Sequence, residues 1–460
     1  MTRIGLMPLY IELYDSAMPE VRPRIDEFLA TIAGELRGRG LEVVETPVCR
    51  VKHEFEGAIR RFEASGAHAI VTLHLAYSPS LESAEALART PLPLIVLDTT
   101  PSPVFGPDSD PDELMYNHGI HGVQDMCNLL VRNGKTFCIE AGHWAESDVL
   151  ERVCGDARAA MAAASMRRAR VGRIGEAFAG MGDFAVESPV LHRIGMEVVE
   201  CSPSDLGDLV PSPDDPEVAS EIAADSERFD ISTINPDLHL KSVQAGLAVR
   251  KWVARERLSA FSMNFLAFTK RSGIPTVPFL EASKSMSRGT GYAGEGDVLT
   301  AGLVGALASA YPQTTFTEMF CPDWSGNRIY LSHMGEINVD VSAEKCVLRE
   351  SEFPWTDIDN PVIAVGRLRS GDAVLVDLAP GPQDELRLIV APVRVVDVTG
   401  HDNMRAAVHG WLQPRMPIAD FLADYSRAGG THHCALIYGE VAGEAACFGE
   451  MMGWRVLHLG

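Results

Sequence analysis

Carboxylate and imidazole side chains that could bind a metal ion lie in four short runs between residues 291 and 434. These side chains are Glu295, Glu318, His333, His432 and His433. Two carboxylates with one or two imidazoles form a hard-to-borderline ligand set, which suits Mn²⁺, Fe²⁺, Co²⁺ or Zn²⁺ better than a soft metal ion. The sequence therefore predicts a divalent-metal site, with the residues before 290 as scaffold and pocket wall.

The neighbours of these side chains strengthen the prediction. Glu295 lies between glycines, and Glu318 lies on a hydrophobic run between Phe316 and Phe320. A carboxylate in apolar surroundings costs free energy unless it is paired or bound to a metal ion. Taken singly, each residue has an ordinary alternative, since most glutamates lie on the surface and many strand histidines are satisfied core residues. The combination favours a functional site.

Such a site suits proton transfer next to a carbonyl group. A divalent metal ion that bridges two oxygens of a bound polyol acidifies the neighbouring C–H bond. Two glutamates on opposite sides could then act as base and acid, and move a proton between C2 and C1 through an enediol. This reaction is aldose–ketose isomerisation. A metal-assisted hydride shift would use the same ligands, and the residue pattern leaves both routes open.

The region before residue 290 alternates predicted strands and helices. Apolar runs predict strands at residues 3–9, 69–75 and 93–98, and helical spacing of apolar residues predicts a helix over 20–39. Strand–helix–strand repetition is typical of a parallel, doubly wound sheet, whose ligands lie at the carboxyl ends of the strands. Polar residues after the first strand, Tyr10 among them, are therefore pocket candidates.

A second α/β unit is predicted from residue 136, and a β region from 361 to 399. The second unit begins with a strand at 136–141 and a helix at 148–166. The β region holds predicted strands at 362–365, 373–378, 386–391 and 393–398. Several short strands at this spacing predict a small antiparallel barrel or sandwich.

Composition narrows the class of protein. The 460 residues carry 40 Lys and Arg against 63 Asp and Glu, a net charge of −23. This charge argues against nucleic-acid binding, which needs basic patches. No run approaches the roughly 18 apolar residues of a membrane span. The nine cysteines form no C-x-x-C pair, so we expect a protein of the reducing cytoplasm. From the charge and the lack of a long apolar run, we expect no nucleic-acid or membrane partner.

Taken together, the motifs resemble those of the L-arabinose isomerase and L-fucose isomerase superfamily. Four of them follow in the family's order: the Glu-Gly-Asp run at 291–297, Phe-x-Glu at 316–318, His-Met-x-Glu at 333–336 and Gly-Gly-x-His-His at 429–433. The run 117–122 is similar to the family's Asn-x-x-x-His-Gly element at a helix start. The resemblance covers most of the chain.

The resemblance implies roles for individual residues. Metal ligands would be Glu295, Glu318, His333 and His433, holding Mn²⁺ or another divalent ion such as Co²⁺, Fe²⁺, Mg²⁺ or Zn²⁺. Glu295 and Glu318 would also be the catalytic acid–base pair. Substrate would be met by His432, His121 and the pocket candidate Tyr10. Family members assemble as homo-trimers or homo-hexamers with shared active sites, so His121 could serve a neighbouring protomer.

The implied fold is α/β: two Rossmann-like, doubly wound domains and a C-terminal domain that contains an antiparallel β-barrel. We expect an N-terminal domain at 1–135, a central domain at 136–295 and the barrel-containing domain at 296–460. The metal ligands would lie at the boundary between the central and C-terminal domains.

Departures from the family pattern indicate a divergent, arabinose isomerase-like branch. Val298 and Leu299 stand where arabinose isomerases usually have Trp-Lys, and the N-terminal Gly-x-Gln-x-Leu-Tyr motif is absent. Fucose isomerases have Asp where this chain has Glu318.

We therefore expect a metal-dependent aldose–ketose isomerase, an intramolecular oxidoreductase, that acts on a pentose or a hexose or deoxyhexose. Its partner would be a small-molecule sugar. Two alternatives stay open. One is a non-catalytic sugar-binding or regulatory protein, and the other is a metal-dependent lyase on a sugar acid.

Overall fold

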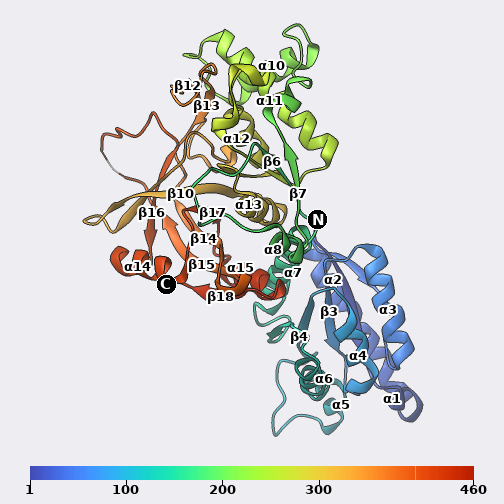
Figure 1. The fold of residues 1–460 in the computed structure, drawn as a ribbon. Helices are drawn as coiled ribbons and strands as arrows, with labels where there is room; N and C mark the ends of the chain where they lie inside the picture. The colour runs from blue at the N-terminus through green and yellow to red at the C-terminus, as the bar shows by residue number, and fades with distance from the viewer. Residues whose placement is uncertain (399) are drawn as a thin grey trace. The chain divides into compact units, whose positions relative to one another are not determined.

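The computed structural model describes residues 1–398 and 400–460. Residue 399, the last of the predicted β region, lies outside the described residues. The chain forms two compact units, Met1–Met161 and Ala162–Gly460, and each is described by itself (Figure 1). Within the described residues, no helix is both long and apolar enough to cross a membrane.

The first unit is built on a parallel sheet whose strand order is β2-β1-β3-β4-β5. Its strands are β1 (Arg3–Leu9), β2 (Glu42–Glu45), β3 (Ala69–His74), β4 (Leu94–Asp98) and β5 (Cys138–Ala141). The helices of the first 166 residues are α1 (Glu12–Ala17), α2 (Arg22–Gly38), α3 (Lys52–Ser65), α4 (Ser80–Arg89), α5 (Leu114–Asn117), α6 (Ile120–Arg132) and α7 (Val149–Met166). β3 is buried along its whole length, as expected for a central strand of a parallel sheet.

The second unit contains another parallel sheet, with the order β7-β6-β8-β9. Its strands are β6 (Arg170–Ile174), β7 (Glu197–Cys201), β8 (Ala260–Met263) and β9 (Gly291–Gly294). The helices of this unit after α7 are α8 (Ser188–Arg193), α9 (Pro203–Gly207), α10 (Pro216–Arg228), α11 (Pro236–Glu256), α12 (Phe279–Ser287), α13 (Val298–Ala310), α14 (Ile418–Ala428) and α15 (Ala442–Met451).

Six antiparallel strands of the described chain close into a barrel. Their order is β14-β17-β10-β11-β16-β15, and pairing of β14 with β15 completes the circle. They are β10 (Thr314–Asp323), β11 (Arg328–Ser332), β14 (Gly371–Pro380), β15 (Leu386–Val395), β16 (His409–Pro414) and β17 (His433–Tyr438). β18 (Arg455–His458) adds to β15 in parallel. The barrel core includes Leu331, Leu375, Leu412 and Leu436.

Helix α13 connects the parallel sheet to the barrel. It is apolar on all sides and buried over Val298–Ala308, as expected for a helix with no solvent face. It packs on β8 and β9 and also on the barrel strands β10 and β17 (Figure 1). Residues at the start of α13 are therefore held against the barrel.

The mixed α/β fold, the parallel sheets and the antiparallel barrel predicted from the sequence are confirmed. The finer Rossmann-like description and the three-domain division at 1–135, 136–295 and 296–460 stay predictions. One strand assignment was wrong: the predicted strands 386–391 and 393–398 are not separate, because residues 386–395 form the single strand β15. The strand predicted at 362–365 is confirmed as β13 (Val362–Val365), and it pairs with β12 (Val347–Glu350) outside the barrel.

Candidate metal centre

Glu295 lies in the tight connection between β9 and α13. Its φ of +64° is in the left-handed region, where a residue with a side chain is destabilised by about 1–2 kcal/mol. The next residue, Gly296, also has a positive φ of 83°, and a Cβ there would come within 2.6 Å of the Cα of Ala177. The backbone is thus held in an unfavourable conformation that directs the Glu295 carboxylate, a feature that is common at functional sites.

The barrel brings four more of the predicted residues together. Glu318 on β10 pairs with Ser332 on β11 and with His433 on β17. His333 directly follows Ser332, and His432 directly precedes His433. Both Glu318 and His433 are buried, the imidazole of His433 completely. Antiparallel register therefore fixes one carboxylate beside the histidines of two neighbouring strands.

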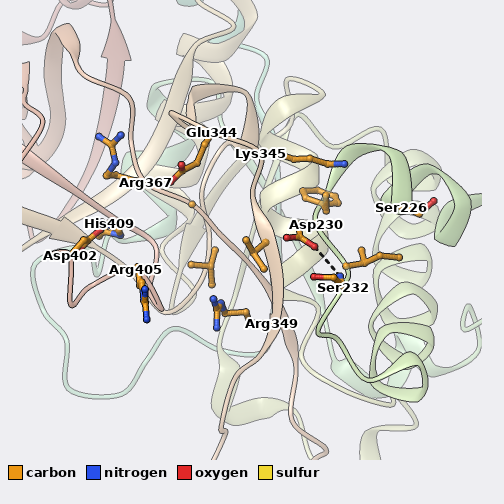
Figure 2. A pocket seen from close by; sticks show the side chains of 15 residues that line it. Ser226, Asp230, Ser232, Glu344, Lys345, Arg349, Arg367, Asp402, Arg405 and His409 are labelled. Atoms are coloured by element: carbon orange, nitrogen blue, oxygen red, sulfur yellow. Dashed lines mark hydrogen bonds and ion pairs between the residues drawn. The ribbon is translucent and has the colours of Figure 1, made fainter.

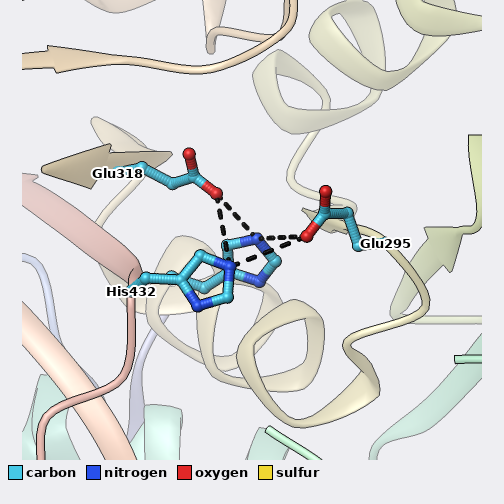
Figure 3. A group of neighbouring side chains, drawn as sticks. Glu295, Glu318 and His432 are labelled. Carbon is cyan, nitrogen blue, oxygen red and sulfur yellow. Dashed lines mark ion pairs between the residues drawn. The ribbon is translucent and has the colours of Figure 1, made fainter. Parts of the chain in front are cut away.

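The Nε2 atoms of the histidines face the two carboxylates. Nε2 of His433 lies 2.9 Å from Oε1 of Glu318 and 3.6 Å from Oε2 of Glu295. Nε2 of His432 lies 3.6 Å from Glu295 and 3.7 Å from Glu318, and Nε2 of His333 lies 3.6 Å from Oε1 of Glu318. Figure 3 shows Glu295 and Glu318 on opposite sides of the imidazoles. All five predicted residues thus converge on one place.

Four of these residues form the tightest group. One ligand atom each from Glu295, Glu318, His432 and His433 lies within 4.8 Å of the others. Oε2 of Glu295 is buried and has no hydrogen-bond partner among the described residues, and Nε2 of His433 faces only the Glu295 and Glu318 carboxylates. Buried polar atoms are rarely left without a partner. A buried carboxylate oxygen without a partner, beside an imidazole nitrogen that meets only carboxylates, fits a divalent cation of the Mn²⁺ or Fe²⁺ class.

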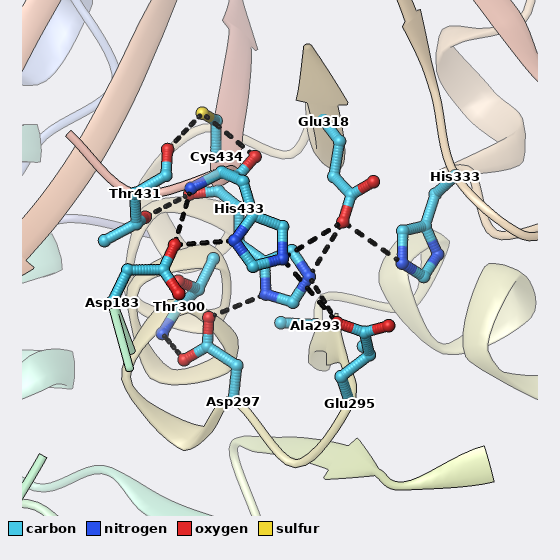
Figure 4. Close-up of polar contacts among 12 residues, drawn as sticks. Asp183, Ala293, Glu295, Asp297, Thr300, Glu318, His333, Thr431, His433 and Cys434 are labelled. Carbon is cyan, nitrogen blue, oxygen red and sulfur yellow. Dashed lines mark hydrogen bonds and ion pairs between the residues drawn. The ribbon is translucent and has the colours of Figure 1, made fainter. Parts of the chain in front are cut away.

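Each imidazole is oriented by a second carboxylate that hydrogen-bonds its Nδ1. His433 Nδ1 lies 2.9 Å from Oδ2 of Asp297, and His333 Nδ1 lies 2.7 Å from Oε2 of Glu336. His432 Nδ1 lies 2.6 Å from Oδ2 of Asp183. Figure 4 shows the contacts that Asp183 and Asp297 make with the imidazoles. A carboxylate on Nδ1 leaves the Nε2 lone pair for a metal ion and increases its basicity.

Aromatic rings hold the imidazoles from the other sides. Phe184 stacks on His433, with the ring centroids 5.1 Å apart and the planes 8° from parallel. Phe316 meets both His333 and His433 edge-on, at 4.8 and 5.0 Å. These contacts exclude water from the rings and restrict their rotation.

The surrounding charges keep protons on the imidazoles. Burial alone would lower the pKa of His433, but Asp297 and Glu318 raise it to about 10. Burial also lowers the pKa of His333, but the carboxylates of Glu336 and Glu318 raise this pKa by more, so it lies above its usual value. Burial would raise the pKa of Glu318, yet its hydrogen bond with His433 and the neighbouring imidazoles hold it below the usual range. The site is therefore negative enough to attract cations, and a metal ion would replace protons there.

The other two predicted residues, Tyr10 and His121, lie in the first unit. Tyr10 follows β1 and is fully buried, and its hydroxyl has no partner among the described residues. Its ring meets Tyr14 edge-on at 5.9 Å, and the Tyr14 hydroxyl lies 3.2 Å from Nε2 of His118. The His118 ring lies 6.0 Å from that of His121, which is exposed on α6. Tyr10 and His121 therefore belong to one local cluster.

Sequence reasoning missed the carboxylates that hold the imidazoles. Two of them had a local signal: Asp297 directly precedes a helix, and Glu336 follows His333 by three residues. Asp183 is 249 residues from His432, so no spacing in the sequence relates them.

A separate pocket of about 790 Å³ lies elsewhere in the second unit (Figure 2). Its lining mixes Arg349, Arg367 and Arg405 with Asp230 and Asp402, and includes none of the predicted site residues. A divalent cation would be repelled by the guanidinium groups. The chemistry is therefore assigned to the carboxylate–imidazole cluster.

Comparison with known proteins agrees with the motifs. Residues 313–455 match the model of the L-arabinose isomerase C-terminal domain. The L-arabinose isomerase of Geobacillus thermodenitrificans is 27% identical over 94% of this chain and 90% of its own length. That of Herpetosiphon aurantiacus is 26% identical over 91% and 86%, and that of Escherichia coli 25% identical over 83% and 78%. The family resemblance predicted from the motifs is confirmed.

The structural similarity to a solved sugar-binding protein is weak. A periplasmic solute-binding protein of an ABC transporter from Actinobacillus succinogenes, with bound D-allose, aligns over 67% of this chain and 92% of its own. The sequence identity is 13% and the TM-score is 0.19, which is too low to support a common fold.

Proposed function

Because the chain is an arabinose isomerase-like protein, we propose that it is a metal-dependent aldose–ketose isomerase. One observation carries this proposal: Glu295, Glu318, His333, His432 and His433 converge on one place, where a buried oxygen of Glu295 has no hydrogen-bond partner among the described residues. The relatives named above are L-arabinose isomerases. For this chain the substrate is a pentose or a hexose or deoxyhexose.

The metal ion would be held by Glu295, Glu318, His333 and His433. Mn²⁺ suits this set of carboxylate and imidazole ligands, and Co²⁺, Fe²⁺, Mg²⁺ or Zn²⁺ are the alternatives. When bound, the ion polarises the substrate carbonyl and acidifies the neighbouring C–H bond. Asp297 and Glu336 support this arrangement by holding the Nδ1 protons of His433 and His333.

Glu295 and Glu318 are the proposed base and acid. Both carboxylates reach the same imidazole nitrogen from different directions (Figure 3), so a sugar bound at this site would have a carboxylate near each of two adjacent carbons. One glutamate takes the proton from C2 while the other protonates the carbonyl oxygen on C1, which gives an enediol. The second glutamate then removes the proton of the C2 hydroxyl while the first returns its proton to C1, which gives the ketose. His432 is less buried than His433, and Asp183 orients it, so it is the proposed contact to a sugar hydroxyl.

The remaining parts of the proposal extend beyond this cluster. His121 would bind sugar in the site of a neighbouring protomer of a homo-trimer or homo-hexamer with shared sites, and Tyr10 is the remaining candidate for sugar binding. The protein would act in the cytoplasm. The chain would be divided into three domains, at 1–135, 136–295 and 296–460.

A non-catalytic sugar-binding protein is the main alternative, and Val298-Leu299 is the feature that suggested it. Both side chains are buried in the first turn of α13, with exposures of 4% and 1%. Helix packing therefore accounts for these apolar residues without a loss of activity, which favours the enzyme. A lyase on a sugar acid would be recognised by its products.

A sugar panel tests the proposal. Pentoses, hexoses, 6-deoxyhexoses and sugar acids are incubated with protein that has been stripped of metal and then reloaded with Mn²⁺. Sugar binding is measured by calorimetry, and the products are identified after the protein is removed. The expected result is conversion of one sugar class by the Mn²⁺-loaded protein only. Saturable sugar binding without turnover would contradict an isomerase, and so would loss of water from a sugar acid.

A further inference from the structure

The Asp377 carboxylate is buried in the barrel wall, and its hydrogen-bond partners among the described residues are neutral groups. The residue lies on β14 and is 1% exposed. Its Oδ2 accepts hydrogen bonds from the Thr431 backbone N–H at 2.8 Å and from the Tyr425 hydroxyl at 2.9 Å. Its Oδ1 lies 2.8 Å from the Thr431 hydroxyl. Neutral groups alone therefore stabilise this side chain, and burial raises its pKa to about 7.

All of these contacts act on the turn that carries the two histidines. Thr431 directly precedes His432, and its hydroxyl also lies 2.8 Å from the backbone carbonyl oxygen of His433. The Tyr425 hydroxyl lies 2.7 Å from the carbonyl oxygen of Thr431. A Cβ at position 430 would come within 2.3 Å of the Tyr425 ring, so only glycine allows the turn to approach so closely. The backbone before His432 is thus fixed from several directions.

This arrangement complements the one at the ring of His433. Asp297 holds the imidazole by its Nδ1 from the start of α13, whereas Asp377 holds the backbone from β14. A ligand set works only when its atoms stay within a few tenths of an ångström of their positions. Asp377 fixes the backbone and Asp297 fixes the ring, and together they keep the ligand atoms of this turn in place.

We propose that Asp377 is a positioning residue that acts through Thr431 and fixes the His432–His433 turn opposite Glu295 and Glu318. The inference rests on the proposed function, since a metal ion is what requires these distances. Asp377 itself touches neither metal ligand nor substrate. It sets how tightly the metal is bound and how the imidazoles are presented.

Matched threonine variants test this inference. Thr431→Val removes the hydroxyl that meets Asp377. Thr314→Val is the control, because Thr314 is also fully buried in the barrel and its hydroxyl donates to a backbone carbonyl, that of Tyr311. Asp377→Asn keeps the shape of the side chain but can no longer accept both Thr431 contacts and the tyrosine bond. Affinity for Mn²⁺ alone is measured by calorimetry.

We expect Thr431→Val and Asp377→Asn to weaken Mn²⁺ binding about 10- to 100-fold, the usual effect of losing support behind a metal ligand. Thr314→Val should bind Mn²⁺ as the wild type does, although both threonine variants lose stability. Wild-type affinity in Thr431→Val, or an equal loss in Thr314→Val, would overturn the inference.

A second measurement separates this inference from the metal proposal. Metal-free protein with ¹⁵N-labelled histidine gives ring signals that report the tautomer and environment of His432 and His433. These signals should move in Thr431→Val and Asp377→Asn but not in Thr314→Val. If the wild type binds no Mn²⁺, the proposed function fails, and the ring signals still decide the positioning role. Unchanged ring signals in both test variants would refute it.

Discussion

Oδ2 of Asp297 lies 2.9 Å from Nδ1 of His433, and both side chains are fully buried. The other oxygen of the same carboxylate accepts the backbone N–H of Thr300 at 2.9 Å and so caps helix α13. One residue therefore begins the helix that connects the sheet to the barrel and orients a proposed metal ligand. The packing of α13 is coupled through this carboxylate to the geometry of the metal centre.

Asp297→Asn should separate these two tasks. Asparagine is as good an N-cap as aspartate, so the helix should keep its start. The amide is neutral and no longer stabilises the Nδ1 proton of His433, so Mn²⁺ affinity should fall about 10- to 100-fold. Asp215→Asn is the matched control, since Asp215 caps α10 in the same way. Equal Mn²⁺ affinities of the two variants by calorimetry would contradict this role.

Glu295→Gln and Glu318→Gln should each abolish most turnover while the fold is kept. Loss of a catalytic acid or base costs about 10²- to 10⁴-fold in rate, and each variant also loses a charged metal ligand. Turnover of the sugar identified from the panel is measured beside far-UV circular dichroism. Glu344→Gln serves as the control, because Glu344 is exposed and lines the pocket of Figure 2, which includes none of the proposed metal ligands. Wild-type turnover in both test variants would remove the glutamates from the mechanism.

Local patterns predicted much of the fold. The apolar run 3–9 gave β1 with its observed bounds, and the run 362–365 gave β13. Closure of the barrel depends on pairing between β14 and β15 and on β16, whose sequence HGWLQP has no clear alternation. Pairings of this kind are set by burial between distant strands, so a local pattern does not reveal them.

The candidate site shows the same division. Glu295, Glu318, His333, His432 and His433 could be recognised because glycines and hydrophobic runs make their surroundings unusual. Asp183 could not, because it lies in a loop without a regular pattern. Asp377 lies in the apolar run 373–378, which is the same kind of signal as at Glu318, and sequence reasoning missed it. Their roles follow from contacts made across the unit, at Nδ1 of His432 and at Thr431.

Removal of metal should lower the thermal stability of the wild type. An ion that binds only the folded state stabilises it by about 2.7 kcal/mol at a concentration of 100 times Kd. Scanning fluorimetry should therefore show a lower Tm after chelation and recovery on addition of Mn²⁺. Glu318→Gln should show a much smaller recovery. Identical responses of the two proteins would place the stabilising ion somewhere else.

Asp377 predicts a specific pH dependence of stability. Its pKa of about 7 in the folded protein lies above the usual value of about 3.9 in an unfolded chain. Between these values the folded state holds a proton that the unfolded state lacks, so this contribution to stability is lost as the pH rises toward 7.

Asp377→Asn cannot titrate and lacks that contribution. The Tm of the wild type minus that of Asp377→Asn should therefore fall as the pH rises from 5 to 7, and level off above 8. All other groups are common to the two proteins, so the difference isolates Asp377. A difference that does not change with pH would show that Asp377 stays ionised in the folded protein.

Turnover in D₂O by Mn²⁺-loaded protein is the most direct test of the proposed isomerisation. The sugar that is converted is recovered, and deuterium at C1 and C2 is measured by NMR after the metal is removed. Proton transfer from C2 to C1 by way of a glutamate, which exchanges its proton with solvent, predicts a ketose that carries solvent deuterium at C1, and no ketose when Mn²⁺ is withheld. Ketose without deuterium would contradict proton exchange at these glutamates, and the absence of ketose from every sugar would contradict the isomerase.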